Sequence, residues 1–365
     1  MVFHVREERV TDQQPTRILA GDLGGTKCTL TLFSVEGPTL EPLCRFSALT
    51  REFANVGGLL DSFREYARRE GFEVGRGALT SVALGVAGTI VEDQVVSNNL
   101  TWTVGVASVA SSLGLATENV LLLNDLVATA SSLAHLKPSD VLPLNEGAPQ
   151  YGGAKALIAA GTGLGEAILY WDRNRYRVFP SEAGLSDFSP RTDREFLLVQ
   201  SLRQRMSHVC VEEVVSGRGF RDIHQIIFPD VQHSWFEDPA VDAAARITQQ
   251  GLGGECHACS ETLQIWTEAY GAEAGNMALR ILPFGGVYVA GGIALKILPK
   301  LKDGSFVRAF SDKQKLSTQL AKIPIFVVLN EDAPVLGSAY AALEALRETG
   351  DESYLLADRS PRNCT

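Results

Sequence analysis

The sequence predicts an α/β protein built from two related halves. The chain has 365 residues, which corresponds to about two domains at roughly 150 residues each. Apolar runs alternate with stretches of helical spacing, an order that suits a mixed sheet with helices on its faces. A strand, a glycine-rich turn and a second strand occur near the start of each half, at 21–26 (GDLGGT) and 161–165 (GTGLG). We therefore expect a duplicated core.

The expected elements of the first half are, in order, strands at 17–22, 29–35 and 42–49, a helix at 57–70, strands at 79–87 and 120–123, and a helix from 125 to about 134. The first three strands are short apolar runs joined by tight turns, which favours an antiparallel meander. The helix at 57–70 is predicted by Leu59, Leu60 and Phe63, which share one face.

The expected elements of the second half are strands at 156–160 and 166–171, helices at about 192–207, 218–227, 238–249 and 255–282, strands at 287–290 and 323–329, and a closing helix at 334–347. Residues 138–153 are rich in Pro and Gly, which is typical of a connector. We therefore expect a small domain at 17–135 plus 334–348 and a large domain at 136–333. Polar tails are expected at 1–16 and 349–365.

Composition excludes several classes of protein. The chain has 33 Lys+Arg and 43 Asp+Glu, a formal charge of −10, which argues against binding to nucleic acid or to an anionic membrane surface. A run of 18 apolar residues is absent from the sequence, as is the apolar segment of a secretory signal at its start. The six cysteines are too scattered for a disulfide framework. We expect a cytoplasmic protein.

Three glycine-rich sites predict contacts with phosphate. The turn containing Gly21, Asp22, Gly24, Gly25 and Thr26 can bring backbone N–H groups close to phosphate oxygens, because no Cβ intervenes. Asp22 is a candidate for holding Mg²⁺ through water. The alternative is a tight hairpin in which the acid serves only the turn.

The second site contains Gly161, Thr162, Gly163 and Gly165, and the Thr162 hydroxyl adds a donor. The third is Gly291-Gly292, between a buried strand and a helix, where adenosine could lie. Neither the dinucleotide-binding G-x-G-x-x-G pattern nor the P-loop pattern is present. Together the three sites indicate an ATP cleft between two duplicated domains.

Asn124 and Asp125 lie between an apolar strand and an apolar helix. A carboxylate at this position can accept a proton from an attacking hydroxyl, as phosphoryl transfer requires. The alternative is a helix N-cap, a position that Asn and Asp often occupy.

With these motifs, the sequence resembles the bacterial-type glucokinases. These enzymes are distinct from the ROK group and have the two-domain, ribonuclease-H-like fold of hexokinase and the actin-like ATPases. The matching segments are 21–26 (GDLGGT), 97–102 (SNNLTW), 123–128 (LNDLVA), 160–165 (AGTGLG), 180–190 (PSEAGLSDFSP), 215–220 (VSGRGF), 284–293 (FGGVYVAGGI) and 334–339 (PVLGSA). They follow the family's order across about residues 17–345.

The resemblance implies transfer of the γ-phosphate of Mg-ATP to the 6-hydroxyl of glucose, with Asp125 as general base. It implies that Asn99, Asn124, Asp125, Glu182 and Glu212 contact the sugar and that the glycine sites hold ATP. It also implies a homodimer. Carboxylates and amides suit sugar hydroxyls, which both donate and accept hydrogen bonds.

The sequence departs from the family at Leu185, where these enzymes usually have a histidine that contacts the sugar near its anomeric end. Leu185 can neither donate nor accept, so a sugar hydroxyl loses a partner unless a neighbour such as Ser186 replaces it. We expect weaker glucose binding or a shifted hexose preference. Other interpretations are an actin-like ATPase, a sugar-sensing repressor and a non-enzymatic sugar binder.

Cys256 and Cys259 have the C-x-x-C spacing of half a zinc site. The sequence offers no second motif for the remaining ligands, and it lacks the multi-cysteine zinc motif of the ROK sugar kinases. We expect His208 and His224, in helical stretches, to be surface or hydrogen-bonded core residues.

Overall fold

The computed structural model describes residues 16–97 and 100–348. These residues form two compact units. Unit 1 comprises residues 16–128 and 334–348, and unit 2 comprises Thr129–Ala333. In the part of the chain that the structure describes, no helix combines the length and apolar character needed to cross a membrane.

Unit 1 is built on a five-stranded mixed sheet with the order β3-β2-β1-β4-β8. Its strands are β1 (Arg17–Leu23), β2 (Lys27–Glu36), β3 (Thr39–Leu49), β4 (Ser81–Val86) and β8 (Val120–Asn124). The first three pair antiparallel, whereas β4 and β8 run parallel to β1. Strand β4 is buried at all six positions, as expected for a strand covered on both faces.

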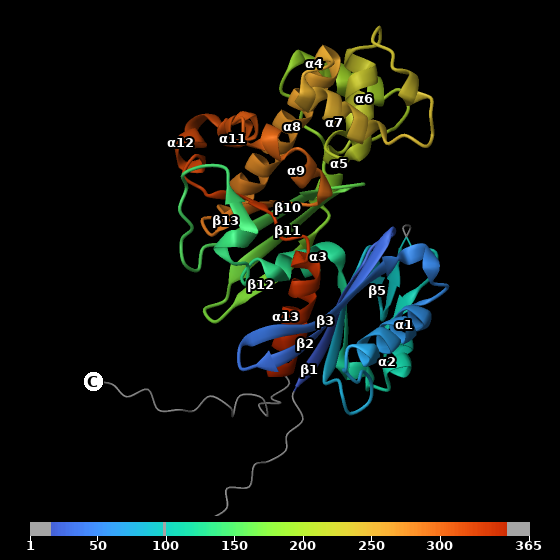
Figure 1. The fold of residues 1–365 in the computed structure, drawn as a ribbon. Coiled ribbons are helices and arrows are strands. Elements are labelled where there is room, and N and C mark those ends of the chain that lie inside the picture. Colours follow the sequence, from blue (N-terminus) through green and yellow to red (C-terminus); the bar gives the residue numbers. More distant parts are fainter. Residues whose placement is uncertain (1–15, 98–99, 349–365) are drawn as a thin grey trace, which may run out of the picture. The chain divides into compact units, whose positions relative to one another are not determined.

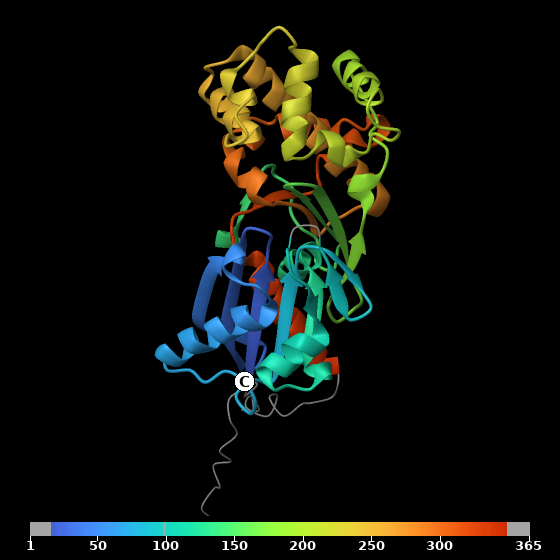
Figure 2. The ribbon, with the colours of Figure 1, turned by 90° about the vertical axis from the view of Figure 1, so that its right-hand side faces the viewer.

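Helices cover both faces of this sheet. Alternate residues of β1 face opposite sides, so Leu19 and Leu23 join a core with α1 (Val56–Arg69) and α2 (Val106–Leu113). Ile18 and Ala20 join a second core with α13 (Ala333–Glu348). The sheet therefore lies between α13 and the α1–α2 pair (Figures 1 and 2). The remaining elements of unit 1 are a small sheet, β5 (Thr89–Val91), β6 (Gln94–Val96) and β7 (Val104–Gly105), and the start of α3 (Asp125–Ser132).

Unit 2 repeats this topology in a six-stranded sheet with the order β12-β11-β10-β13-β14-β9. Its strands are β10 (Lys155–Ala160), β11 (Leu164–Trp171), β12 (Tyr176–Ser181), β13 (Gly286–Ala290), β14 (Ile325–Val328) and β9 (Val141–Pro143). Strands β10–β12 pair antiparallel, and β13 and β14 run parallel to β10. The predicted duplication is therefore confirmed by strand order and direction.

The added strand β9 corrects the prediction of a connector at 138–153. Val141 and Leu142 are apolar, and the strand pairs antiparallel with β14 at the sheet edge. A three-residue edge strand among Pro and Gly gives too short an alternation to be recognised in the sequence.

The helices of unit 2 are α4 (Asp193–Leu202), α5 (Val211–Val214), α6 (Gly217–Ile227), α7 (Ala243–Gly253), α8 (His257–Ile281), α9 (Gly292–Lys296), α10 (Leu298–Leu301), α11 (Ser305–Ser311) and α12 (Ser317–Leu320). Helix α7 begins at Ala243 rather than at the expected 238, because the Asp242 side chain accepts a hydrogen bond from Ala245 N and caps it there.

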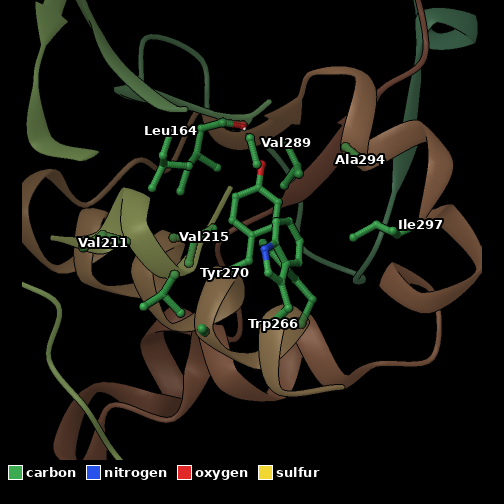
Figure 3. Packing of buried hydrophobic residues seen from close by; sticks show 14 of the residues in the cluster. Leu164, Val211, Val215, Trp266, Tyr270, Val289, Ala294 and Ile297 are labelled. Carbon is green, nitrogen blue, oxygen red and sulfur yellow. Dashed lines mark hydrogen bonds between the residues drawn. The ribbon is translucent and has the colours of Figure 1, made fainter. Parts of the chain in front are cut away.

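The long helix α8 forms the centre of the unit 2 core. Trp266 and Tyr270 point into the apolar cluster (Figure 3), and both side chains are fully buried. Their polar atoms are satisfied: Trp266 Nε1 donates to Ser216 O at 3.0 Å, and Tyr270 OH donates to Ile158 O at 3.1 Å. These bonds attach α8 both to the sheet and to the segment before α6.

Candidate active site

In unit 1, three predicted site residues lie at the same edge of the sheet. Asp22, near the end of β1, pairs with Gly85 in β4, and Gly85 pairs with Leu123 in β8. Asn124 and Asp125 follow directly. Two strand spacings of about 4.8 Å separate β1 from β8. Ligands in open α/β sheets commonly bind at the carboxyl ends of parallel strands.

Asn124 holds the start of α3 in place. Its Oδ1 accepts hydrogen bonds from Leu126 N at 2.9 Å and Val127 N at 3.3 Å, and its Nδ2 donates to Gly88 O at 3.0 Å. Asn124 therefore caps the N-terminus of α3, as the alternative interpretation predicts. Its side chain also connects the helix start to the segment after β4.

Asp125 is the first residue of α3, and its Oδ1 accepts a hydrogen bond from Leu126 N at 2.9 Å. Burial raises the pKa of this carboxyl above its ordinary value, and the hydrogen bond from Leu126 N opposes that shift only partly. A carboxylate with a raised pKa is a stronger proton acceptor.

The first glycine turn consists of Gly24, Gly25 and Thr26, between β1 and β2. Gly24 N donates to Lys27 O at 3.0 Å, and the Thr50 hydroxyl donates to Gly24 O at 2.6 Å. Thr50 N also donates to Thr26 O at 3.0 Å, so one threonine holds both sides of the turn. This role of Thr50 could not be predicted, because the residue lies beyond the end of β3.

Gly21 lies in the core rather than in the turn. A Cβ there would lie 2.5 Å from Leu30 Cδ2 and 2.8 Å from Leu84 Cδ2. The space of the missing side chain is therefore filled by two leucines. Ser338 Oγ of α13 donates to Gly21 O at 3.1 Å.

The second glycine turn, in unit 2, opens onto a pocket of about 550 Å³. The pocket is lined by residues from this turn and from the starts of α6, α7 and α9: Gly161, Thr162, Gly217, Arg218, Phe220, Arg221, Asp242, Ala243, Ala244, Ala245, Thr248, Gly292, Ile293 and Lys296. Three of these side chains are basic and one is acidic. The size and the excess of positive charge suit a phosphate-bearing small molecule.

Glu212 of α5 supports this turn from behind. Its Oε2 accepts a hydrogen bond from Leu164 N at 2.9 Å, and its Oε1 accepts one from Arg218 Nη2 at 3.0 Å. A Cβ on Gly163 would lie 2.3 Å from Glu212 Oε2, so only glycine lets the carboxylate approach. Arg218 also pairs with Glu213 at 2.8 Å. Glu212 therefore fixes both the turn and a basic side chain of the pocket.

The remaining glycines that were predicted to bind ATP lie in β11 and at the start of α9. Gly165 lies within β11. Gly291 is the N-cap of α9 with a φ of 90°, and Gly292 is the first residue of that helix and lines the pocket. The basic pocket residues Arg218, Arg221 and Lys296 are not among the predicted site residues, because a helical pattern alone does not single them out.

Glu182 and Leu185 lie together after β12. Glu182 is exposed, and its backbone oxygen accepts a hydrogen bond from Leu185 N at 3.0 Å. The Leu185 side chain is 52% exposed. His208 connects to this segment, since its Nε2 lies 3.0 Å from Leu185 O and its Nδ1 lies 3.0 Å from Asp187 Oδ1. Asn99 lies outside the described residues.

Comparison with known proteins supports the family resemblance found in the sequence motifs. A family model described as Glucokinase matches residues 19–345. A glucokinase of Nostoc punctiforme is 34% identical over 346 residues, which cover 90% of this chain and 99% of the relative. A glucokinase of Synechocystis is 34% identical over 352 residues, covering 90% of this chain and 98% of the relative.

Solved structures show the same fold. The structure of a glucokinase from an Antarctic psychrotroph has a TM-score of 0.77 and 24% identity, covering 90% of this chain and 99% of that one. A glucokinase from Balamuthia mandrillaris in complex with glucose has a TM-score of 0.72 and 19% identity, covering 92% and 95%. A ROK family glucokinase from Streptomyces griseus in complex with glucose and AMPPNP has a TM-score of 0.58 and 19% identity, covering 90% and 99%.

Proposed function

This chain belongs to the glucokinase family, and from that premise we propose that it transfers the γ-phosphate of ATP to the 6-hydroxyl of glucose. The observation that carries the proposal is the family match over residues 19–345, which includes every described candidate residue. The basic pocket of unit 2 and the half-buried carboxylate of unit 1 are the features of this chain that such a reaction needs.

We propose Asp125 as the general base. It would accept the proton of the 6-hydroxyl as the oxygen attacks the γ-phosphorus, while the leaving ADP keeps the electrons of the broken P–O bond. Its raised pKa and its place at the end of β8 support the role.

We propose that ATP binds in the unit 2 pocket. Arg218, Arg221 and Lys296 would oppose the negative charge of the phosphates, and the backbone of Gly161 and Thr162 would donate to phosphate oxygens. Gly291 and Gly292 would contact the adenosine. The turn of Gly24, Gly25 and Thr26 in unit 1 is a further candidate for backbone contacts with phosphate.

The residues present fit a magnesium ion at Asp22. Mg²⁺ keeps several waters and needs only one or two carboxylates beside the phosphates, and Asp22 is a half-buried carboxylate next to the first glycine turn. When bound, the ion would neutralise charge that develops on the phosphate oxygens.

For the sugar we propose Asn99, Asn124, Glu182 and Glu212 as hydroxyl partners. Glu212 already accepts from Leu164 N and Arg218, but each carboxylate oxygen has a second lone pair available to a hydroxyl. The exposed Leu185 side chain offers no hydrogen bond, which favours a second candidate function, a hexose kinase with shifted sugar preference.

A coupled assay of ADP release tests these proposals with glucose, mannose, fructose, glucosamine and N-acetylglucosamine. Sugar-dependent ADP release with glucose as the best substrate supports a glucokinase. A higher kcat/KM for another hexose, with a gain for glucose in Leu185→His, supports the shifted preference. ADP release that no sugar stimulates would contradict both and favour an actin-like ATPase.

A further inference from the structure

Four side chains that can bind a metal meet in unit 2, at α6, at the start of α8 and at the segment before η5. His224 belongs to α6, and His233 directly precedes the short 3-10 helix η5 (Ser234–Phe236). Cys256 is the N-cap of α8, and Cys259 lies in its first turn. One ligand atom from each residue lies within 4.8 Å of the other three.

The measured distances match a tetrahedral ion. His233 Nε2 lies 3.6 Å from Cys256 Sγ and 3.7 Å from Cys259 Sγ. Zinc bonds of about 2.3 Å to sulfur and about 2.0 Å to nitrogen, at tetrahedral angles, place sulfur and nitrogen about 3.5 Å apart. The two thiols and the imidazole are therefore already spaced as ligands of one ion.

His224 gives a second, independent observation. Its side chain is 0% exposed, and neither ring nitrogen has a hydrogen-bond partner among the described residues. The expectation of a hydrogen-bonded core histidine is therefore wrong. Buried polar atoms normally have a partner, so an unpartnered ring facing two thiols and a second imidazole calls for a missing group.

We propose that His224, His233, Cys256 and Cys259 bind a structural zinc ion. Four protein ligands leave no open position, which distinguishes a structural site from a catalytic one. The surroundings fit the proposal. Cys259 N donates to Cys256 Sγ at 3.3 Å, a contact that stabilises a thiolate, and the Trp235 ring stacks on His233 at 4.6 Å between centroids.

Zinc binding displaces two protons. In the metal-free chain the Cys259 thiol donates to Gln250 Oε1 at 3.5 Å. Coordination replaces each S–H bond with an S–Zn bond, and both protons pass to solvent, so affinity falls as the pH falls. The ion would join the C-terminal half of α6 to the start of α8. Helix α6 also supplies Arg218 and Arg221 to the pocket, so the site would brace one pocket wall.

The metal content of the purified full chain tests this directly. The protein is prepared without a polyhistidine tag or chelator, and its zinc content is measured by inductively coupled plasma mass spectrometry. We expect about one zinc per chain in the wild type and a loss of at least about tenfold in Cys259→Ser and His224→Gln. Two control variants keep the zinc: Cys44→Ser, a buried cysteine of unit 1, and His257→Gln, an exposed histidine beside Cys256.

A cobalt spectrum keeps the test decisive if a variant fails to fold. Wild-type protein is stripped with a chelator, reduced and titrated with Co²⁺ alone. Intense visible bands of tetrahedral cobalt, with thiolate-to-cobalt charge transfer in the near ultraviolet, support the site. Wild-type protein that contains no zinc and gives no such spectrum overturns the proposal, as does a Cys256–Cys259 disulfide found by mass in freshly purified protein. These readouts do not depend on sugar phosphorylation.

Discussion

The two units share one strand order, yet their glycine turns are supported by opposite kinds of chemistry. In unit 1, Gly21 gives up its side-chain volume to Leu30 and Leu84, and a threonine holds the turn. In unit 2, Gly163 gives up its volume to the Glu212 carboxylate, which holds Arg218 at the pocket. In the same strand–turn–strand unit, a strand glycine thus makes room for apolar side chains in unit 1, and a turn glycine makes room for a carboxylate in unit 2.

The strand ends differ in a similar way. Strand β8 ends at Asn124 and is followed by Asp125, and Asn330-Glu331 come shortly after the end of β14. Each asparagine Oδ1 accepts from the backbone N–H two residues later, at 2.9 Å in both units. Both units therefore have the same asparagine turn, whereas the acid that follows the asparagine is half-buried in unit 1 and exposed in unit 2. Unit 2 supplies a matched control for the proposed base.

The largest effect is expected for Asp125→Asn. We expect kcat to fall by about 10²–10⁴-fold, because an amide cannot accept the hydroxyl proton. The circular dichroism spectrum and melting temperature should change little, since the amide oxygen can still accept from Leu126 N. Steady-state kinetics of Asp125→Asn and of the control Glu331→Gln check this. Turnover close to wild type in Asp125→Asn would remove the assignment of a base.

Next in size is the effect of Arg218→Ala on nucleotide binding. Loss of a basic side chain held at the pocket by Glu212 and Glu213 should raise the KM for ATP by about tenfold, equivalent to about 1.4 kcal/mol. Arg69→Ala removes an exposed arginine of unit 1 and should leave this KM unchanged. An equal rise in both variants would indicate a general effect of charge rather than a contact in the pocket.

A smaller, opposite pair of effects is expected for Gly21→Ala and Gly161→Ala. The first places a methyl group against two buried leucines and should cost about 1–3 kcal/mol of unfolding free energy without changing the KM for ATP. The second meets no atom within 4 Å, so stability should hold while nucleotide binding weakens. Denaturant unfolding combined with ATP kinetics separates the two. Equal changes in unfolding free energy and in the KM for ATP in the two variants would contradict the different roles given to Gly21 and Gly161.

The smallest effect concerns pH and Glu166, whose register position in unit 2 corresponds to Leu30 in unit 1. Burial, followed by the nearby Glu273 charge, raises the pKa of Glu166 to about 8. The unfolded carboxyl loses its proton near pH 4.5 while the folded one keeps it. Stability contributed by this group is therefore lost as the pH rises from about 4.5 to about 8. Glu166→Gln should raise the melting temperature at pH 8 more than at pH 5, and the reverse order would contradict the assignment.

Much of the fold could be predicted because apolar periodicity and glycine punctuation are local signals. The strands around both glycine turns, the helix at 57–70 and the closing helix follow from residues close in sequence. Strand β9 depends on pairing with the distant strand β14, and the start of α7 depends on the cap at Asp242. The apolar pattern of the sequence therefore did not predict either of them. The unit 2 pocket and the pairing of Cys256 and Cys259 with two distant histidines exist only after α6, α7 and α8 pack.

Helix α13 carries a consequence for the order in which this protein can be made. Its residues cover one face of the unit 1 sheet, and Ser338 bonds to Gly21, 317 positions earlier. In unit 2, Ile325 N likewise donates to Asn145 Oδ1, 180 positions earlier. A ribosome releases the N-terminus first, so the core of unit 1 cannot close before α13 has been made, and the sheet of unit 2 cannot close before β14 has been made. Until then, apolar surface of the nascent chain stays exposed, which favours aggregation.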